Sequence, residues 1–178
     1  MNRTKTLLVA TAAAASMLGV VPSATSSAAA PAPDTGVHAA AAPIPGVHYL
    51  RPAHAPSKCI TVHGWDTSSN AKIDQWTCQG QRNQRWNFMA NNYRYWIKSD
   101  LSSKCLDAVD IAKGRKVIQW PCKNSLNQSW NPVPRGKNRF QIVVGTRCLD
   151  VEGGSKSNGA RLIVWNCKNV PNQLFYLN

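Results

Sequence analysis

Two sets of side chains in this chain combine a carboxylate, an indole ring and an amide in the same order, and in each set the amide follows the indole by seven residues. An exposed tryptophan offers an apolar plate to the C–H face of a sugar, and a nearby carboxylate and amide can fix the sugar's hydroxyls. The alternative is structural, with the tryptophans in the core and the aspartates capping turns. The sets are Asp107, Trp120 and Asn127, and Asp150, Trp165 and Asn172.

A third set of the same kind is incomplete. Trp76 and Asn83 keep the spacing, but Thr61 stands where the carboxylate is expected. A neutral hydroxyl is a weaker acceptor than a carboxylate, since charge-assisted hydrogen bonds are roughly twice as strong as neutral ones. We therefore expect an inactive or altered site here, with Asp74 as a partial replacement for the missing acid.

All three sets belong to a repeat that covers residues 46–178. The tryptophans recur at 76, 120 and 165 and a glutamine at 84, 128 and 173, in steps of 44 and 45 residues. Such a period marks a fold of three equivalent units, none of which can bury its apolar face alone. The expected core aromatics occupy one place in each copy, and the glutamine two residues earlier is expected to satisfy backbone groups of a buried turn. These aromatics are Trp86, Trp130 and Phe175.

The pattern of apolar residues predicts an all-β fold. Short β-rich stretches and period-two alternation follow one another, separated by Asn, Gly, Ser and Pro, and almost no helical periodicity is visible. Four strands per unit give twelve strands, packed about a common axis. The expected strands are 47–51, 58–62, 72–78, 86–88, 93–97, 105–108, 117–120, 130–133, 140–144, 148–151, 162–165 and 175–177.

The six cysteines predict three disulfides, two cysteines falling at matching positions in each unit. Sequence alone allows 15 pairings. Bridges within units keep the three copies equivalent, whereas the other pairings mostly break this symmetry, so we expect Cys59–Cys78, Cys105–Cys122 and Cys148–Cys167. Each would contribute about 3 kcal/mol in the chain-entropy model. The alternative of a metal site is disfavoured, because no Cys-x-x-Cys pair is present and the histidines lack ligand spacing. We expect no metal and no cofactor.

The first 45 residues differ in kind from the rest. Residues 1–30 predict a secretory signal peptide: a basic start, an apolar run over 6–21, and small residues up to Ala30. A membrane anchor is the alternative, but the run is short for a spanning helix, which needs about 20 apolar residues. Residues 31–45 are rich in Ala and Pro and predict a linker or pro-segment. The expected location is extracellular, with no membrane span.

The chain is strongly basic. Its formal net charge is +13, and removal of Arg3 and Lys5 with the signal peptide leaves +11. This favours contact with anionic partners such as acidic glycans, phosphate-bearing wall polymers, anionic lipid or nucleic acid. The alternative is a solvated basic surface without a partner. No nucleic-acid motif and no long basic helix is visible, so specific binding of nucleic acid is not expected.

The series Cys-Leu-Asp, Trp-x-Cys and Asn-Gln-x-Trp/Phe resembles the ricin B-type lectin domain, a β-trefoil that also occurs as a carbohydrate-binding module on secreted bacterial enzymes. The resemblance covers residues 46–178. It implies twelve strands in three lobes, called here the first (α), second (β) and third (γ), each able to hold one shallow sugar site. It also implies one disulfide within each lobe, in agreement with the pairing above.

The resemblance further implies a role for each site residue. The Asp after the first Cys accepts hydrogen bonds from sugar hydroxyls, the aromatic residue before the second Cys stacks on the sugar ring, and the Asn of the Asn-Gln pair completes the contacts. The second and third lobes keep the whole set. The expected carbohydrate-binding residues are Asp107, Trp120, Asn127 and Gln128, then Asp150, Trp165, Asn172 and Gln173, and in the first lobe Trp76 and Asn83.

Two isoleucines depart from the family pattern. Ile118 and Ile163 stand four residues before the second Cys of their lobes, where the family often has Gln. On a strand, each shares a face with Trp120 or Trp165, because alternate residues point the same way. The lost hydrogen bond is worth about 0.5–1.5 kcal/mol, up to about tenfold in affinity. We expect binding to survive, but the family's galactose-type preference is not carried over.

The motifs favour binding over catalysis. Neither Gly-x-Ser-x-Gly nor His-Glu-x-x-His is present, and Asp107 and Asp150 hold equivalent places in different lobes, not the close pair of a glycosidase. The leading hypothesis is a secreted, non-catalytic lectin that recognises glycans or polysaccharides through the second and third lobes. The alternatives are the cell-binding subunit of a toxin, or a trefoil that binds a protein partner, a protease among them. The persistence of two full sets favours the lectin.

Overall fold

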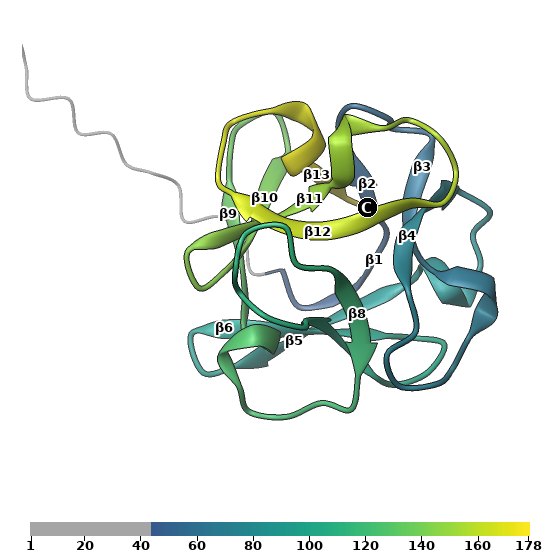
Figure 1. Cartoon of the computed structure of the whole chain (residues 1–178), viewed down its shortest axis with the longest axis vertical. Helices are drawn as coiled ribbons and strands as arrows, with labels where there is room; N and C mark the ends of the chain where they lie inside the picture. The colour runs from purple at the N-terminus through teal and green to yellow at the C-terminus, as the bar shows by residue number, and fades with distance from the viewer. Residues whose placement is uncertain (1–43) are drawn as a thin grey trace, which may run out of the picture. The chain divides into compact units, whose positions relative to one another are not determined.

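The computed structural model describes residues 44–178, which form strands joined by turns and short 3-10 helices (Figure 1). The predicted signal peptide and most of the predicted linker, residues 1–43, lie outside the described residues. Across residues 44–178 no helix has the length and apolar character needed to span a membrane. The strands are β1 (Gly46–His48), β2 (Leu50–Pro52), β3 (Lys58–Val62), β4 (Ile73–Thr77), β5 (Trp86–Asn91), β6 (Arg94–Ser99), β7 (Cys105–Ala108), β8 (Val117–Trp120), β9 (Trp130–Pro134), β10 (Arg139–Val144), β11 (Arg147–Val151), β12 (Ala160–Asn166) and β13 (Phe175–Leu177). The 3-10 helices are η1 (His63–Trp65), η2 (Arg82–Gln84), η3 (Leu126–Gln128), η4 (Glu152–Gly154) and η5 (Pro171–Gln173).

The outer strands of the three lobes close into a barrel. Antiparallel pairing runs from β5 to β6, β9, β10 and β13, and the pairs β13–β2 and β1–β5 complete the ring. The predicted strand 47–51 is therefore two strands, because its halves, on either side of Tyr49, pair with different neighbours. This split accounts for thirteen strands where twelve were predicted. The all-β, three-lobed fold is confirmed, and closure leaves the barrel no free strand edge.

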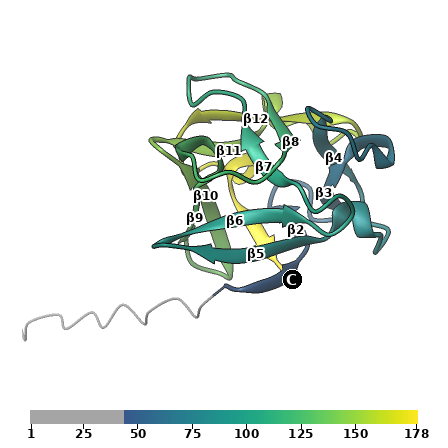
Figure 2. The same cartoon turned by 90° about the horizontal axis from the view of Figure 1, so that it is seen from below.

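The inner strands of each lobe form a hairpin, and the hairpins lie together over one end of the barrel. In Figure 2, β7, β8, β11 and β12 lie above the barrel strands β5 and β6. The two strands of the hairpin pair in the same register in all three lobes, so that the first Cys of each lobe faces the site tryptophan across the ladder. Equivalent side chains in the three lobes therefore occupy equivalent places on their hairpins.

Backbone hydrogen bonds join each hairpin to the next around the common axis. The amide N–H of Asn70, Gly114 and Gly159 donates to the carbonyl of a residue in the following lobe. The acceptors are Gln119 (2.9 Å), Val164 (2.7 Å) and Gln75 (2.8 Å), respectively. The three donors have φ of 69°, 83° and 81°, a left-handed conformation that Gly and Asn adopt at low cost. The same turn chemistry therefore closes the ring of hairpins in all three lobes.

The predicted core aromatics, Trp86, Trp130 and Phe175, are fully buried. The N–H group of each buried indole also has a hydrogen-bond acceptor: Trp86 Nε1 donates to the Ile60 carbonyl at 2.9 Å, and Trp130 Nε1 donates to the Leu106 carbonyl at 2.8 Å. Phe175 has no such donor, so the third lobe keeps the shape of the core without this bond. The prediction that these residues build the fold is confirmed.

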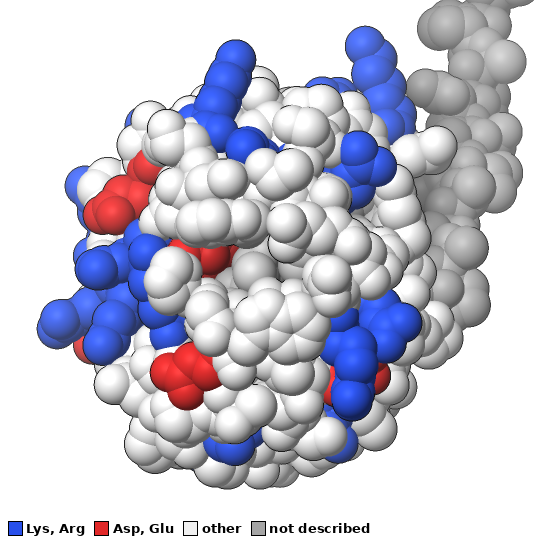
Figure 3. All heavy atoms as spheres, turned by 90° about the vertical axis from the view of Figure 1, so that its right-hand side faces the viewer, with Lys and Arg blue, Asp and Glu red and all other residues white. Residues whose placement is uncertain are grey.

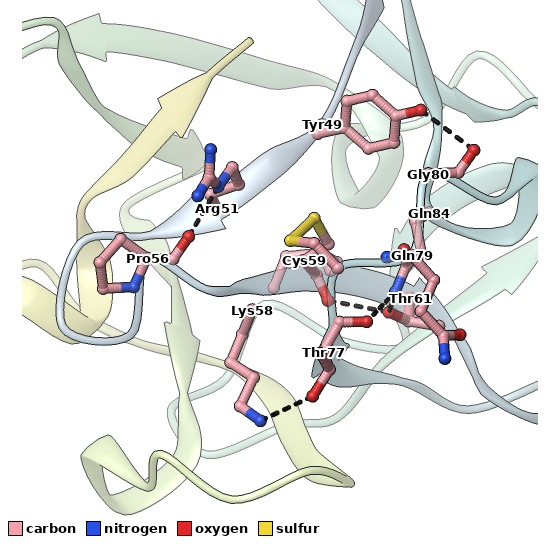
Figure 4. Close-up of a disulfide and its surroundings, with 12 residues drawn as sticks. Tyr49, Arg51, Pro56, Lys58, Cys59, Thr61, Thr77, Gln79, Gly80 and Gln84 are labelled. Carbon is pink, nitrogen blue, oxygen red and sulfur yellow. Dashed lines mark hydrogen bonds between the residues drawn. A yellow bond between two sulfur atoms is a disulfide. The ribbon is translucent and has the colours of Figure 1, made fainter.

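The three predicted disulfides are present, Cys59–Cys78, Cys105–Cys122 and Cys148–Cys167, each with Cα atoms 5.0 Å apart. Each bridge ties the first strand of a hairpin to the residues that follow the second. Figure 4 shows the bridge of the first lobe together with its surroundings, Thr61 and Gln84 among them. The bridges thus fix the base of each hairpin, beside the residues of the site.

The repeated glutamine braces the turn after each bridge. Gln128 Oε1 accepts from the Lys123 amide at 2.7 Å, and its Nε2 donates to the Pro121 carbonyl at 3.1 Å. Gln84 and Gln173 make the equivalent bonds in their lobes. Because all three are buried, these bonds give their amide groups backbone partners in place of water. The predicted structural role of this glutamine is confirmed.

Candidate functional site

Each lobe has a hollow beside its hairpin, lined by the residues that the sequence singled out. The hollow of the third lobe measures ≈ 440 Å³, that of the first ≈ 370 Å³ and that of the second ≈ 210 Å³. The site tryptophan, the asparagine and an acidic residue line each of them. The structure therefore brings each predicted set together, and keeps the three sets apart.

The third-lobe hollow is built around Asp150, which is 5% exposed. Asn172 Nδ2 donates to Asp150 Oδ1 at 3.0 Å, and Gln173 Nε2 donates to Oδ2 at 2.7 Å. Ile163, directly opposite Asp150 in the β11–β12 ladder, and Trp165 give the apolar part of the lining. The result is an oriented carboxylate beside an aromatic ring.

The second-lobe hollow repeats this arrangement with almost the same geometry. Asn127 Nδ2 donates to Asp107 Oδ1 at 2.8 Å, and Gln128 Nε2 donates to Oδ2 at 2.7 Å. Ile118 faces Asp107 across the β7–β8 ladder, and Trp120 is 39% exposed. Gln128 thus serves both the turn and the carboxylate, a double role that Gln173 shares.

Burial controls the charge of these carboxyls. Desolvation raises the pKa of Asp107 and of Asp150 above the ordinary value, because it disfavours the charged form. The amide donors of the neighbouring Asn and Gln act in the opposite direction, since they stabilise the carboxylate. The Asn and Gln therefore offset part of the cost of burying the charged form.

The first-lobe hollow takes its acid from the other strand of the hairpin. Asp74 is fully buried, faces Thr61 across the β3–β4 ladder and lines the hollow together with Trp76. Its Oδ2 contacts His63 Nδ1 at 2.6 Å and Lys72 Nζ at 3.2 Å, while its Oδ1 has no hydrogen-bond partner among the described residues. Burial again raises the pKa of this carboxyl, against the effect of Lys72 and His63.

Asn83 also leaves an acceptor open in the first-lobe hollow. Its Nδ2 donates to the Val62 carbonyl at 3.2 Å, and its buried Oδ1 has no partner within residues 44–178. Where the other lobes have a carboxylate bonded by Gln, Gln84 Nε2 lies 3.2 Å from the hydroxyl of Thr61. The first lobe is therefore an altered site with free acceptors from Asp74 and Asn83.

Trp65 is a site residue that the sequence did not reveal. It ends η1, lines the first-lobe hollow and is 48% exposed. Its φ is 60°, in the left-handed region, which is unusual for a bulky side chain. At the equivalent place the third lobe has Gly154, with φ of 63°. The comparison of the two copies, Trp against Gly, is the signal that could have marked this position.

Contacts between lobes position the rims of the hollows. Gln119 of the second lobe donates to the carbonyls of Asp66 and Ser68, both at 2.8 Å, and so holds the loop that follows Trp65. Gln75 of the first lobe makes the matching bonds to Ser155 and Ser157 in the third. The rims of the first and third lobes are therefore each supported by a strand from a neighbouring lobe.

The third-lobe tryptophan is covered in part by the second lobe. The ammonium of Lys113 lies 4.3 Å from the centroid of the Trp165 ring, a cation–π contact. An added Cβ on Gly114 would lie 3.3 Å from Trp165 Cζ3, so the indole packs closely on this glycine. Lys113 is not among the residues that line the hollow, and it therefore holds the ring without filling the site.

Comparison with known proteins places this geometry in a family. The model of the ricin-type beta-trefoil lectin domain matches residues 47–175. This chain belongs to the ricin-type beta-trefoil lectin family. No match to a curated protein sequence was found.

Three solved structures that are similar to this lectin domain are matched over nearly their whole length. The designed threefold symmetric protein ThreeFoil is 29% identical, with a TM-score of 0.71, over 74% of this chain and 97% of the other. A ricin B-like lectin of Macrolepiota procera, solved in complex with lactose, is 20% identical, with a TM-score of 0.66, over 74% and 94%. The C-half of an earthworm R-type lectin, in complex with GalNAc, is 22% identical, with a TM-score of 0.61, over 75% and 98%.

Family membership supports a carbohydrate-binding role for this lectin domain rather than a catalytic one. Within residues 44–178, no group of three or more His, Cys, Asp or Glu side chains is arranged to hold a metal ion.

Proposed function

We propose that this protein is an exported lectin that binds glycans or polysaccharides at the second and third lobes. The observation that carries the proposal is the arrangement of Asp107 and Asp150. Each carboxylate is held by two amide donors beside a tryptophan, in two hollows of the same molecule. A buried carboxylate held in this way on a hairpin surface is more than the fold requires, because the first lobe folds with Thr61 in the same place.

The hydrogen-bonding capacity left in these hollows matches a sugar. A carboxylate has about four acceptor positions, of which the Asn and Gln amides use two. Asn172 Nδ2 donates to both Asp150 and the Val151 carbonyl, so its Oδ1 is left as an acceptor. The hollow thus offers acceptors to a ligand that donates, and Ile163 and Trp165 offer apolar surface. Hydroxyl groups on one edge of a sugar ring, with C–H groups on its face, meet both requirements.

A single site of this kind should bind weakly, on the order of millimolar, or about −4 kcal/mol. Two sites on one rigid body gain affinity on a polymeric or surface-bound glycan through avidity. We therefore infer that the natural ligands are polysaccharides or dense glycan surfaces. The lactose and GalNAc named for the related structures are starting probes, although Ile118 and Ile163 favour a less polar contact than the family's usual Gln.

The test is a glycan array with a polysaccharide pull-down, comparing the wild type with Trp120→Ala, Trp165→Ala and the double variant. Tyr93→Ala is the matched control, because Tyr93 is a fully exposed aromatic residue in the β5–β6 turn, away from the hollows. We expect each single variant to weaken retention and the double variant to abolish it, with Tyr93→Ala unchanged. A folded double variant that binds like the wild type would refute the proposal.

Two other functions remain as alternatives, a cell-binding subunit of a toxin and a protein-binding trefoil such as a protease inhibitor. Both would act through a protein partner, and the second needs only one exposed loop. Binding to an immobilised glycan in the absence of any other protein separates the lectin from the protein-binding trefoil, and a toxin subunit would be recognised by a partner chain that co-purifies with it. Export is tested by N-terminal sequencing of the protein from culture medium, where cleavage near Ala30 is expected.

A further inference from the structure

Three basic residues occupy one repeat position, four residues before the site tryptophan of each lobe: Lys72, Lys116 and Arg161. Their backbones lie where the hairpins meet. Each pairs with the residue two places before the site tryptophan of the next lobe. The pairs are Lys72 with Ile118, Lys116 with Ile163, and Arg161 with Asp74. The three pairs form a closed cycle around the common axis, near the centre of Figure 1, where β4, β8 and β12 converge.

A separate hollow of ≈ 110 Å³ lies among these three side chains. The charged residues that line it are the three basic ones, and none is acidic. The uncharged lining comes from Asn70, Val117 and Ile118. Two of these, Asn70 and Ile118, also line the hollow of the second lobe. The axial hollow therefore lies next to a candidate sugar site.

The charges around the axial hollow are only partly balanced. Lys72 contacts Asp74 at 3.2 Å and donates to the Gly159 carbonyl at 2.9 Å. Lys116 and Arg161 are exposed and, within residues 44–178, make no ion pair and no side-chain hydrogen bond. Like charges held close together repel, and an anion between them would relieve this repulsion. Figure 3 shows a neighbouring face, where Lys and Arg cover more of the surface than Asp and Glu.

We propose that Lys72, Lys116 and Arg161 form an anion-binding site at the axis, which takes a sulfate or carboxylate group of an acidic glycan. The guanidinium of Arg161 can bind two oxygens of such a group, and the lysines supply compact positive charges. The identity of the ligand as a glycan rests on the proposed function, because the same chain would then occupy a lobe hollow. The anion site itself rests on the axial residues alone.

The first test follows backbone amides by NMR during titration with sodium sulfate, against sodium chloride at equal ionic strength. We expect saturable shifts around residues 70–72, 115–118 and 159–161 with sulfate only, and their loss in Lys116→Gln/Arg161→Gln. The matched control is Lys104→Gln/Arg147→Gln. It removes the same two residue types from the same two lobes, at a repeat position just before the first Cys. Absence of saturable sulfate shifts, or their equal loss in the control, overturns the proposal.

The second test uses chondroitin sulfate and its desulfated, carboxyl-reduced form. The axial variant should lose about tenfold in affinity for the sulfated form, the size of one lost charged hydrogen bond, and keep its affinity for the neutral form. The control variant should lose much less. If sulfate still shifts the axial amides but no glycan binds through Trp120 or Trp165, the proposed function fails and the anion site stands. If Trp-dependent binding is found without sulfate shifts, the anion site fails alone.

Discussion

Asp74 lies directly opposite Thr61 in the β3–β4 ladder, at the register where Asp107 faces Ile118 and Asp150 faces Ile163. The acid of the first lobe thus lies on the second strand of the hairpin instead of the first, and the small polar residue Thr61 occupies the position that holds the acid in the other lobes. Gln84, whose counterparts bond a carboxylate, approaches the Thr61 hydroxyl instead. The first lobe therefore keeps the amide side chains that orient the acid in the other lobes, but it has no acid at that position.

Exchanging the two residues should rebuild the arrangement of the other lobes. In a background of Trp120→Ala and Trp165→Ala, Thr61→Asp with Asp74→Ile places a carboxylate within reach of Gln84 and Asn83. We expect binding of the ligand of the third lobe to appear, as measured by isothermal titration calorimetry. Asp74→Ile alone, which leaves no acid on either strand, is the control and should not bind. A folded exchange variant that binds no better than this control would contradict the account.

Trp65→Gly should separate stability from binding. Gly removes the cost of the left-handed conformation, so the free energy of unfolding should rise by about 1 kcal/mol, while the first-lobe hollow loses an aromatic wall. The neighbouring Gly64→Ala is the matched control. Gly64 is also left-handed, with φ of 59° and nothing within 4 Å of an added Cβ, so this variant should lose stability for conformational reasons alone. Chemical denaturation measures both changes, and a destabilised Trp65→Gly would show that the indole supports the fold.

The pH dependence of binding and of stability should run in opposite directions. Ligand hydroxyls need ionised Asp107 and Asp150, so binding should be lost as the pH falls through their folded-state pKa, which burial raises above 3.8. Because their pKa is raised, these groups bind protons more tightly in the folded chain than in the unfolded chain. The stability that they contribute is therefore fully present below the unfolded-state pKa and is lost as the pH rises through the folded-state pKa. Glycan titrations and urea unfolding over this range measure both. A binding midpoint at or below 3.8 would contradict the raised pKa.

Trp130→Phe should be tolerated, because the third lobe has Phe175 at the same place. The change removes the bond from Nε1 to the Leu106 carbonyl and leaves a buried acceptor unsatisfied, at a cost of about 1–3 kcal/mol. Trp86→Phe should cost a similar amount, since its bond to Ile60 is equivalent. Thermal unfolding measures both losses. Failure of either variant to fold would mean that the indoles do more than fill the core.

The fold could be predicted from the sequence because its determinants repeat at fixed spacing. The cysteine pairs, the core aromatics and the bracing glutamine each recur in all three units, so one copy explains the others. The same repeat located the carboxylate, indole and amide sets of the second and third lobes. The splitting of strand 47–51 was not visible, because it depends on which distant strands pair with its two halves.

The remaining site features depend on contacts between lobes, which a repeat read one unit at a time does not show. Gln119 supports the loop of Trp65, and Lys113 covers Trp165, each across a lobe boundary. The sequence predicts Asp74 as a partial replacement for the missing acid, but its position opposite Thr61 follows only from the register of the ladder. These residues are recognised by the differences between the three copies of the repeat, not by what the copies share.

Contact of Trp120 and Trp165 with a glycan can be observed through the indole N–H signals of the seven tryptophans. In an NMR titration with the oligosaccharide best retained on the array, we expect saturable shifts of the Trp120 and Trp165 signals. The buried indoles of Trp86 and Trp130 should stay unchanged as internal controls. No saturable shift in the folded protein, or a shift confined to other tryptophans, would contradict the account.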